Sequence, residues 1–340
     1  MADVEALGLQ KFENSLSNPF LTWFASGFQA YSLDMKNTGR HALLISLGLI
    51  LGSVIATSAT ADQPQSIAVI DSGIPTSLFP NIVDEVCILE YSMCPNGKSF
   101  MDGVGAANIA PSTNLTLTHG TEMLSIISKV NPSAKLIPIR IVGVTAAGNP
   151  YIYSNNAVKL ALDWVVANRV KYNITVVNVS QGKIFTGCAI PQGTAQDIAT
   201  LKANNVAVIG ATGNDSNRTS MMSIACLPDV VSIGATDNPD PGSSGKPYDP
   251  NAKPYIARYS NGNAQTSFYL NARWFVLQPS GKTKFMVGTS NSAAAMSGWW
   301  SLNRQATWQA TYDFMIKSSG TATNEWLSGK YVDLPFSLDK

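Results

Sequence analysis

The sequence predicts an α/β fold of three layers, in which a mainly parallel sheet carries helices on both of its faces. Short apolar runs rich in β-branched residues alternate along the chain with segments of helical periodicity. The short runs lack the polar alternation of a half-exposed strand, so they are typical of parallel strands covered on both faces. Successive strand–helix–strand units then imply right-handed crossovers within one sheet. At 340 residues the chain has room for about two domains, or for one large domain with an appendage.

Each predicted element rests on a short segment of sequence. Runs of four to seven residues are predicted as strands: Ser66–Ile70, Leu136–Val142, Thr175–Val179, Val206–Ile209 and Val230–Ile233. Apolar spacing predicts helices over His119–Lys129, Ala157–Arg169, Thr194–Asn204 and near Tyr312–Ile316. The Pro- and Gly-rich stretch 238–253 is predicted as a surface loop. Trp299, Trp300 and Trp308 are expected to pack against the sheet rather than to form an aromatic binding surface.

Composition excludes several classes of protein. The chain has 23 Lys and Arg against 22 Asp and Glu, a formal net charge of +1, so it lacks the basic excess of a nucleic-acid binder. The 45% hydrophobic content argues against general disorder. The sequence has neither a G-x-G-x-x-G after its first predicted strand nor a phosphate-binding G-x-x-x-x-G-K-[ST], which argues against a nucleotide-binding protein.

An uncharged apolar run near the N-terminus indicates export. Ala42–Ile55 is 14 residues long, shorter than the roughly 20 residues of a membrane span. Lys36 and Arg40 precede it, and Ala59-Thr60-Ala61 supplies the small-x-small pattern of a cleavage site. We therefore predict cleavage after Ala61 and an exported, periplasmic or extracellular, protein with no stable membrane span. An uncleaved membrane anchor is the alternative.

The same pattern divides the chain. Residues 35–61, beginning at Met35, form the predicted secretory signal peptide, and 62–340 form the mature domain. Residues 1–34 are then surplus and are interpreted as an over-called N-terminal extension. Because they carry some helical apolar spacing, a translated amphipathic extension is the alternative.

All four cysteines follow the predicted cleavage point, which fits an oxidising compartment. No Cys-x-x-Cys spacing occurs, so neither a zinc site nor a thioredoxin-like site is supported. Four cysteines permit three pairings, and of these we favour Cys87–Cys94 with Cys188–Cys226. Four free buried thiols in a reducing compartment are the alternative.

Three residues near predicted strand ends carry the groups of a nucleophilic enzyme. Asp71 follows the first strand, His119-Gly120-Thr121 opens a helix, and Gly288-Thr289-Ser290 opens another. A serine hydroxyl becomes nucleophilic when a histidine takes its proton, and the histidine needs an acceptor that fixes its tautomer. Taken singly, Asp71 could be a turn residue, His119 a helix cap and Ser290 an N-cap.

Several blocks in the same order resemble the subtilisin-like serine proteases, the subtilases of peptidase family S8. IAVIDSGI, HGT and GTSNSAAAMSG are similar to the three signature blocks of that family, in the chain order Asp, His, Ser. VVNVSQG, VIGATGN, VVSIGAT and ARYSN are similar to four further segments. The resemblance runs from about Ser66 to Gly298, and it implies a subtilisin-like fold.

The resemblance also implies a function. Ser290 would be the nucleophile, His119 the general base and then acid, and Asp71 the orienting carboxylate. Asn214 would donate its side-chain amide to the oxyanion, together with the backbone N–H of Ser290. Ser180, Gln181 and Gly182 would pair as a strand with the backbone of a polypeptide substrate. The chain is thus expected to be a secreted serine endopeptidase acting through an acyl-enzyme. A catalytically silent, peptide-binding relative is the alternative.

The chain departs from the family pattern at several positions. Glu122 stands where the family usually has a second histidine, and Ala294 and Ala295 replace the usual Pro and His after the nucleophile. Asn291-Ser292 is also atypical, so the turn that holds Ser290 could be displaced from its usual position in the family. The segment 129–135 is too short for the loop that binds calcium in many relatives, and we predict no cofactor, although calcium could bind elsewhere.

Other expectations concern partners and specificity. No room exists for the usual inhibitory prodomain between the predicted cleavage and Asp71, so folding either proceeds unaided or uses a chaperone or inhibitor in trans. A monomer is expected. Asp215 follows the oxyanion Asn214, where it either favours a basic substrate side chain or is a solvated turn carboxylate.

Overall fold

The structure is a computed structural model that describes residues 64–109, 114–144, 150–151, 155–184, 186–237 and 253–334. The chain is divided between residues 59 and 60, and every described residue belongs to the second unit, Thr60–Lys340. The predicted extension 1–34, the signal peptide 35–61 and most of the loop predicted over 238–253 lie outside the described residues and stay predictions.

The second unit is built on an eleven-stranded sheet that includes all five predicted strands. Its strands follow one another in the order β10 (Tyr255–Ile256), β14 (Gly320–Thr323), β15 (Ser328–Tyr331), β11 (Phe268–Asn271), β9 (Val231–Asp237), β8 (Ala207–Ala211), β7 (Ile174–Val179), β1 (Ser66–Asp71), β4 (Lys135–Arg140), β2 (Val86–Ile88) and β3 (Phe100–Asp102). Every neighbouring pair from β11 to β2 is parallel. The predicted mainly parallel sheet is therefore confirmed.

Smaller elements surround this sheet. Two hairpins stand apart from it, β5 (Gly143–Val144) with β6 (Pro150–Tyr151) and β12 (Trp274–Leu277) with β13 (Thr283–Met286). Two short 3₁₀ turns are also present, η1 (Thr76–Leu78) and η2 (Thr186–Cys188).

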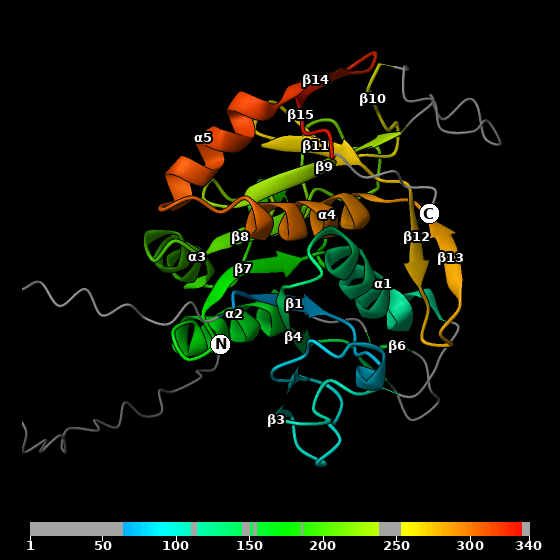
Figure 1. The fold of residues 1–340 in the computed structure, drawn as a ribbon, viewed down its shortest axis with the longest axis vertical. Coiled ribbons are helices and arrows are strands. Elements are labelled where there is room, and N and C mark those ends of the chain that lie inside the picture. The colour runs from blue at the N-terminus through cyan, green and yellow to red at the C-terminus, as the bar shows by residue number, and fades with distance from the viewer. Residues whose placement is uncertain are drawn as a thin grey trace, which may run out of the picture. The chain divides into compact units, whose positions relative to one another are not determined.

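Helices cover both faces of the sheet, as the sequence predicts. One face packs against α1 (Leu115–Val130), α4 (Thr289–Leu302) and α5 (Trp308–Ser318), and the other against α2 (Asn155–Asn168) and α3 (Thr194–Ala203). In β1, Ile67 and Val69 join the first core, whereas Ala68 and Ile70 join the second. Both faces of the strand are buried, which is why its sequence shows no polar alternation. Helices α1 and α4 lie side by side across the middle of the sheet (Figure 1).

The start of α1 differs from the prediction. The helix begins at Leu115 rather than at His119, because the Asn114 side chain caps it by accepting a hydrogen bond from Thr116 N at 3.0 Å. The two threonines of Leu115–Thr118 are weak helix formers, and they hide the first turn from a reading of the sequence. His119 therefore lies in the second turn of the helix and not on the turn that precedes it.

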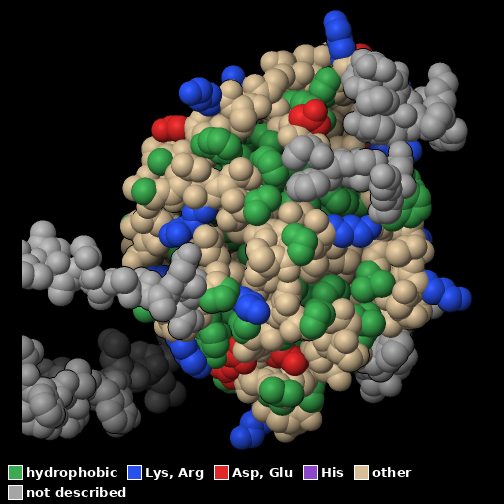
Figure 2. All heavy atoms as spheres, viewed as in Figure 1, with side chains coloured by type: hydrophobic (Ala, Val, Ile, Leu, Met, Phe, Trp, Pro, Cys, Tyr) green, Lys and Arg blue, Asp and Glu red, His purple; other side chains and the backbone are tan. Residues whose placement is uncertain are grey.

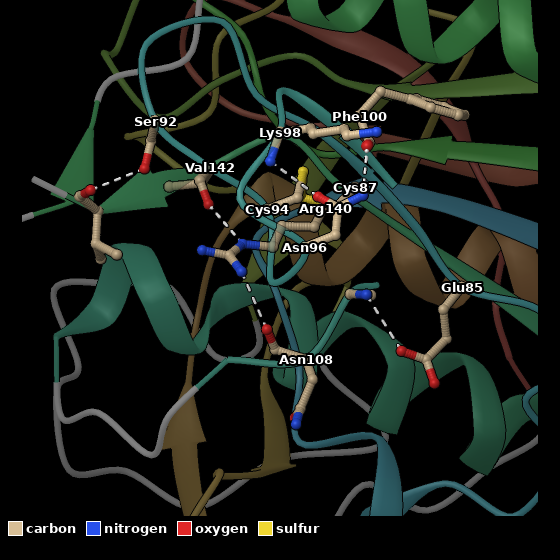
Figure 3. Close-up of a disulfide and its surroundings, with 12 residues drawn as sticks. Glu85, Cys87, Ser92, Cys94, Asn96, Lys98, Phe100, Asn108, Arg140 and Val142 are labelled. Atoms are coloured by element: carbon tan, nitrogen blue, oxygen red, sulfur yellow. Dashed lines mark hydrogen bonds between the residues drawn. A yellow bond between two sulfur atoms is a disulfide. The ribbon is translucent and has the colours of Figure 1, made fainter. Parts of the chain in front are cut away.

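Both disulfides form with the favoured pairing. Cys87 in β2 joins Cys94 seven residues on, and Cys188 in η2 joins Cys226. The Cys87–Cys94 loop reaches the short strand β5, where Ser92 Oγ donates to Val144 O at 2.9 Å (Figure 3). These bonds hold irregular segments against the sheet.

Trp299, Trp300 and Trp308 pack against the core of the domain, as predicted. Trp300 and Trp308 are 1% and 8% exposed, and Tyr312 stacks on Trp308 with ring centroids 5.1 Å apart. Phe268 of β11 contacts the same group through Tyr312. The face of the molecule in Figure 2 is mostly uncharged, with scattered Lys, Arg, Asp and Glu side chains, in keeping with the near-zero net charge.

Candidate active site

The site lies at the carboxyl edge of the parallel sheet, where ligands of α/β proteins gather. Asp71 is the last residue of β1 and is 1% exposed. Its strand runs between β4 and β7, with Ile70 opposite Val179, so Ser180 and Gln181 emerge at the same edge. Asn214 lies three residues after the end of β8, the next strand along. The topology thus brings together residues that are far apart in the sequence.

Asp71 and His119 form a hydrogen-bonded pair. His119 Nδ1 lies 2.9 Å from both Oδ1 and Oδ2 of Asp71. Ser72 N also donates to Asp71 Oδ1 at 2.7 Å, which orients the carboxylate. With its Nδ1 proton directed at Asp71, the imidazole presents a free Nε2 that can act as a base.

A glycine permits this pair to form. Gly120 N donates to Ser72 Oγ at 2.8 Å, and a Cβ at Gly120 would lie only 2.4 Å from Ser72 O. Helix α1 can therefore approach the turn after β1 only with glycine at this position.

The surroundings of His119 favour its protonated form. Burial lowers the pKa of His119, but the charge and hydrogen bond of Asp71 and the charge of Glu122 outweigh it, so the pKa is raised above its ordinary value. The side chain of His119 is 21% exposed, whereas Glu122, three residues along α1, is 1% exposed. Glu122 Oε1 accepts from Thr118 Oγ1 at 2.9 Å and from Gln278 Nε2 at 3.0 Å. The residue that departs from the family pattern is thus a bonded carboxylate on the helix of His119.

Ser290 lies in the first turn of α4, as predicted. Helix α4 begins after Gly288, and Ser290 Oγ donates to Ser180 O at 3.4 Å. Ser180 Oγ in turn donates to Ser290 O at 3.4 Å. Within the described residues Ser290 Oγ has no hydrogen bond to the ring of His119.

Asn214 lies beside the turn that leads into α4. Its Oδ1 accepts from Thr289 N at 2.9 Å and from Thr289 Oγ1 at 3.1 Å. Its Nδ2 faces Gly288, where a Cβ would lie 3.5 Å away. Because its oxygen is occupied and its side chain is exposed, the amide N–H groups can donate to a bound molecule.

The segment Ser180–Gly182 continues β7 past the sheet. A Cβ at Gly182 would lie 2.5 Å from Ser223 O, so this segment runs close to the Met222–Ser223 backbone. The Cys188–Cys226 disulfide joins the same two stretches of chain. The Gln181 side chain points toward Asp71 and His119: its Nε2 lies 2.9 Å from Asp71 Oδ1 and 3.1 Å from His119 Nδ1. Sequence reasoning placed Gln181 on the substrate strand and missed this contact.

Two atypical residues of α4 prove to be anchors. Asn291 Nδ2 donates to Ala272 O at 3.0 Å, and Ser292 Oγ donates to Leu270 O at 2.9 Å. Both bonds tie the first turn of α4 to the end of β11. Ala294 and Ala295, the other two departures in this helix, are fully buried.

Asp215 has a bonded carboxylate. Asn261 Nδ2 donates to Asp215 Oδ2 at 2.8 Å, and Asp215 N donates to Asn261 Oδ1 at 2.9 Å. These bonds favour the interpretation of Asp215 as a turn residue.

In the described part of the chain, no three His, Cys, Asp or Glu side chains form a group that could hold a metal ion. In the same part, none of the helices has the length and apolar character needed to cross a bilayer.

Comparison with known families agrees with this geometry. A model of the subtilase family, Peptidase S8, matches residues 62–328. The chain belongs to the subtilase family. It is accordingly a serine peptidase of subtilisin type, and the match extends about 30 residues beyond the blocks that carry the resemblance in the sequence.

Solved structures show the same fold. This subtilase is similar to a cold-adapted subtilisin-like serine proteinase, with a TM-score of 0.57 and 17% identity over 80% of this chain and 89% of that chain. It is also similar to a mutant form of the protease domain of PatA, with a TM-score of 0.55 and 16% identity over 76% and 87% of the two chains. The prenylagaramide maturation protease PagA matches with a TM-score of 0.52 and 21% identity over 76% and 84%.

Proposed function

We propose that this subtilase is a secreted serine endopeptidase that hydrolyses peptide bonds with Ser290, His119 and Asp71 through an acyl-enzyme. The observation that carries the proposal is the position of His119 Nδ1, 2.9 Å from both carboxylate oxygens of Asp71. That arrangement leaves Nε2 as the base of the pair, on a helix that packs directly against the helix of Ser290.

The first half of the reaction forms the acyl-enzyme. Ser290 Oγ attacks the substrate carbonyl carbon while His119 Nε2 takes its proton, and Asp71 stabilises the imidazolium. Asn214 Nδ2 and the backbone N–H of Ser290 donate to the oxyanion. The C–N bond then breaks, His119 returns the proton to the leaving amine, and the substrate acyl group remains on Ser290 Oγ.

Hydrolysis of the ester completes the cycle. Water attacks the acyl carbon as His119 takes one of its protons, and that proton returns to Ser290 Oγ when the acid product leaves. Substrate would pair along Ser180–Gly182, and backbone hydrogen bonds would supply affinity there.

Export is supported by the two disulfides. Such bonds persist in oxidising compartments and are rare in the cytosol of most organisms. N-terminal sequencing of the protein recovered outside the cytoplasm should begin at Asp62. A start at Met1 or at Met35 in that fraction would contradict the predicted cleavage.

A fluorophosphonate probe tests the proposed chemistry, because it reacts covalently with activated serines. Mass mapping of the labelled protein should place the probe on Ser290. Labelling should disappear in Ser290→Ala, fall sharply in His119→Ala and persist in Ser128→Ala, a control on α1. A folded protein that binds peptides without labelling would support the catalytically silent alternative and refute the proposed triad.

A further inference from the structure

The Gln181 side chain lies against the Asp71–His119 pair. Its Nε2 donates to Asp71 Oδ1 at 2.9 Å, the same oxygen that accepts from Ser72 N at 2.7 Å. His119 Nδ1 lies 2.9 Å from that oxygen as well. The Asp71 carboxylate therefore accepts hydrogen bonds from three donors, and Gln181 competes with His119 for Oδ1.

The fold explains how Gln181 reaches this place. Strands β1 and β7 are adjacent and parallel, with Ile70 opposite Val179. Asp71 follows Ile70 by one residue and Gln181 follows Val179 by two, so both leave the sheet at the same level. The Gln181 side chain is half-buried, and its amide turns back across the end of β1.

The amide group opposes a positive charge on the ring in two ways. Its hydrogen bond to Asp71 takes up part of the negative charge that would otherwise stabilise the imidazolium. Its N–H end, 3.1 Å from His119 Nδ1, also directs a positive partial charge at the ring. Both effects therefore destabilise the imidazolium form of His119.

Few other charges face His119. Burial lowers the pKa of His119, and the charges of Asp71 from β1 and of Glu122 from α1 raise it. Helix α4 and strand β12, which also pack against α1, contain no charged residue. Arg140 of β4 is opposite Asp71 in the sheet, but its Nε donates to Val142 O and its Nη1 to Asn108 O, and it is not among the groups that shift the pKa of His119. Gln181 is thus the neutral group best placed to offset the two carboxylates.

We propose that Gln181 is a positioning residue of the peptidase site, which shares Asp71 with His119 and limits how tightly Asp71 holds the imidazolium. This inference rests on the proposed function for its catalytic meaning. A histidine held too firmly as imidazolium is a poor base near neutral pH, so Gln181 keeps His119 available to take the proton of Ser290.

The test measures the protonation of His119 directly. The full chain contains two histidines, His41 and His119, so ¹⁵N-histidine labelling gives two sets of imidazole signals, assigned with His41→Gln. Titration is done in the Ser290→Ala background, which prevents self-digestion. Gln181→Met keeps the shape and removes the donor, and Gln181→Glu replaces it with a third carboxylate.

A matched control uses another glutamine with the same kind of bond. Gln309 Nε2 donates to Asp313 Oδ1 at 2.8 Å on the exposed face of α5, so Gln309→Met removes an amide–carboxylate bond away from the site. The pKa of His119 should rise in Gln181→Met, rise further in Gln181→Glu and stay at the wild-type value in Gln309→Met. An unchanged or lower pKa in Gln181→Met would overturn the inference.

Kinetics give a second readout in the active chain. A rise of half a pH unit in the pKa lowers fluorophosphonate labelling on the acidic side about threefold. The acidic limb of the pH–rate profile should therefore move to higher pH in Gln181→Met, and a limb that stays in place would count against the inference. A wild-type chain that never labels would instead refute the proposed function, and the His119 titration would still test Gln181.

Discussion

The close approach of α1 to the turn after β1 makes the substitution Gly120→Ala a sharp test of the site. A Cβ at Gly120 would lie 2.4 Å from Ser72 O, whereas carbon and oxygen atoms in proteins seldom come closer than about 3.3 Å. The helix would have to retreat by about 1 Å, which would stretch the 2.8 Å hydrogen bond from Gly120 N to Ser72 Oγ beyond bonding range.

Two costs and one gain set the magnitude. Overpacking costs about 1–3 kcal/mol, and the lost hydrogen bond costs about 1 kcal/mol. Alanine in place of glycine within a helix gains about 1 kcal/mol. The net expectation is a protein less stable by about 2 kcal/mol. Because His119 is the adjacent residue, a shift of about 1 Å should also lower catalysis about 100-fold.

Urea unfolding gives the stability, and the rate of fluorophosphonate labelling gives the catalytic effect. Ser128→Ala, on the same helix, is the control for helix propensity and should be neutral or slightly stabilising. If Gly120→Ala were more stable than the wild type and labelled at the same rate, the close contact between α1 and Ser72 would not exist and the account of the site would be wrong.

Three further predictions follow from the described residues. Replacing Cys188 and Cys226 together by serine should lower the free energy of unfolding by about 4 kcal/mol, measured in urea, since the bond closes a 38-residue separation. Labelling should be lost as the pH falls through the raised pKa of His119, and Glu122→Gln should move that loss to lower pH; a move to higher pH would contradict the assigned effect of the Glu122 charge. Asn214→Ala should lower kcat about 10²–10³-fold with little change in KM, whereas a raised KM with unchanged kcat would indicate that Asn214 binds substrate and transition state equally.

The architecture was predictable because the positions of apolar residues along the chain reflect which strands and helices are buried. Runs such as Ser66–Ile70 have no polar alternation, and burial of β1 on both faces is the physical cause of that pattern. The disulfide pairing also agrees with the prediction, although the cysteine count leaves three choices open. The first turn of α1 was not predicted from the sequence, because the cap at Asn114 outweighs the low helix propensity of the threonines that follow it.

The finer contacts of the site could not be predicted, because they depend on which way a side chain turns once the strands are adjacent. The sequence places Gln181 beside the substrate strand, but only the packing of β7 against β1 puts its amide on Asp71. Asn291 and Ser292 likewise differ from the family pattern, and their roles become visible only with the carbonyl groups of Ala272 and Leu270 that they bind at the end of β11. The sequence showed only that these polar residues stand at unusual positions, and it did not show which group each of them would bind.

The order of the site residues along the chain has a consequence for the timing of activity. Helices α1 and α4 join late parts of the chain to early ones, as in the bond between Asn131 and Ser301 across 170 residues. Contacts of such long range form slowly. During synthesis from the N-terminus, Asp71 and His119 emerge well before Ser290, so a half-made chain holds a base without a nucleophile. Under the proposed mechanism, peptidase activity therefore requires synthesis of the last third of the chain, which supplies Ser290 and the helix that holds it.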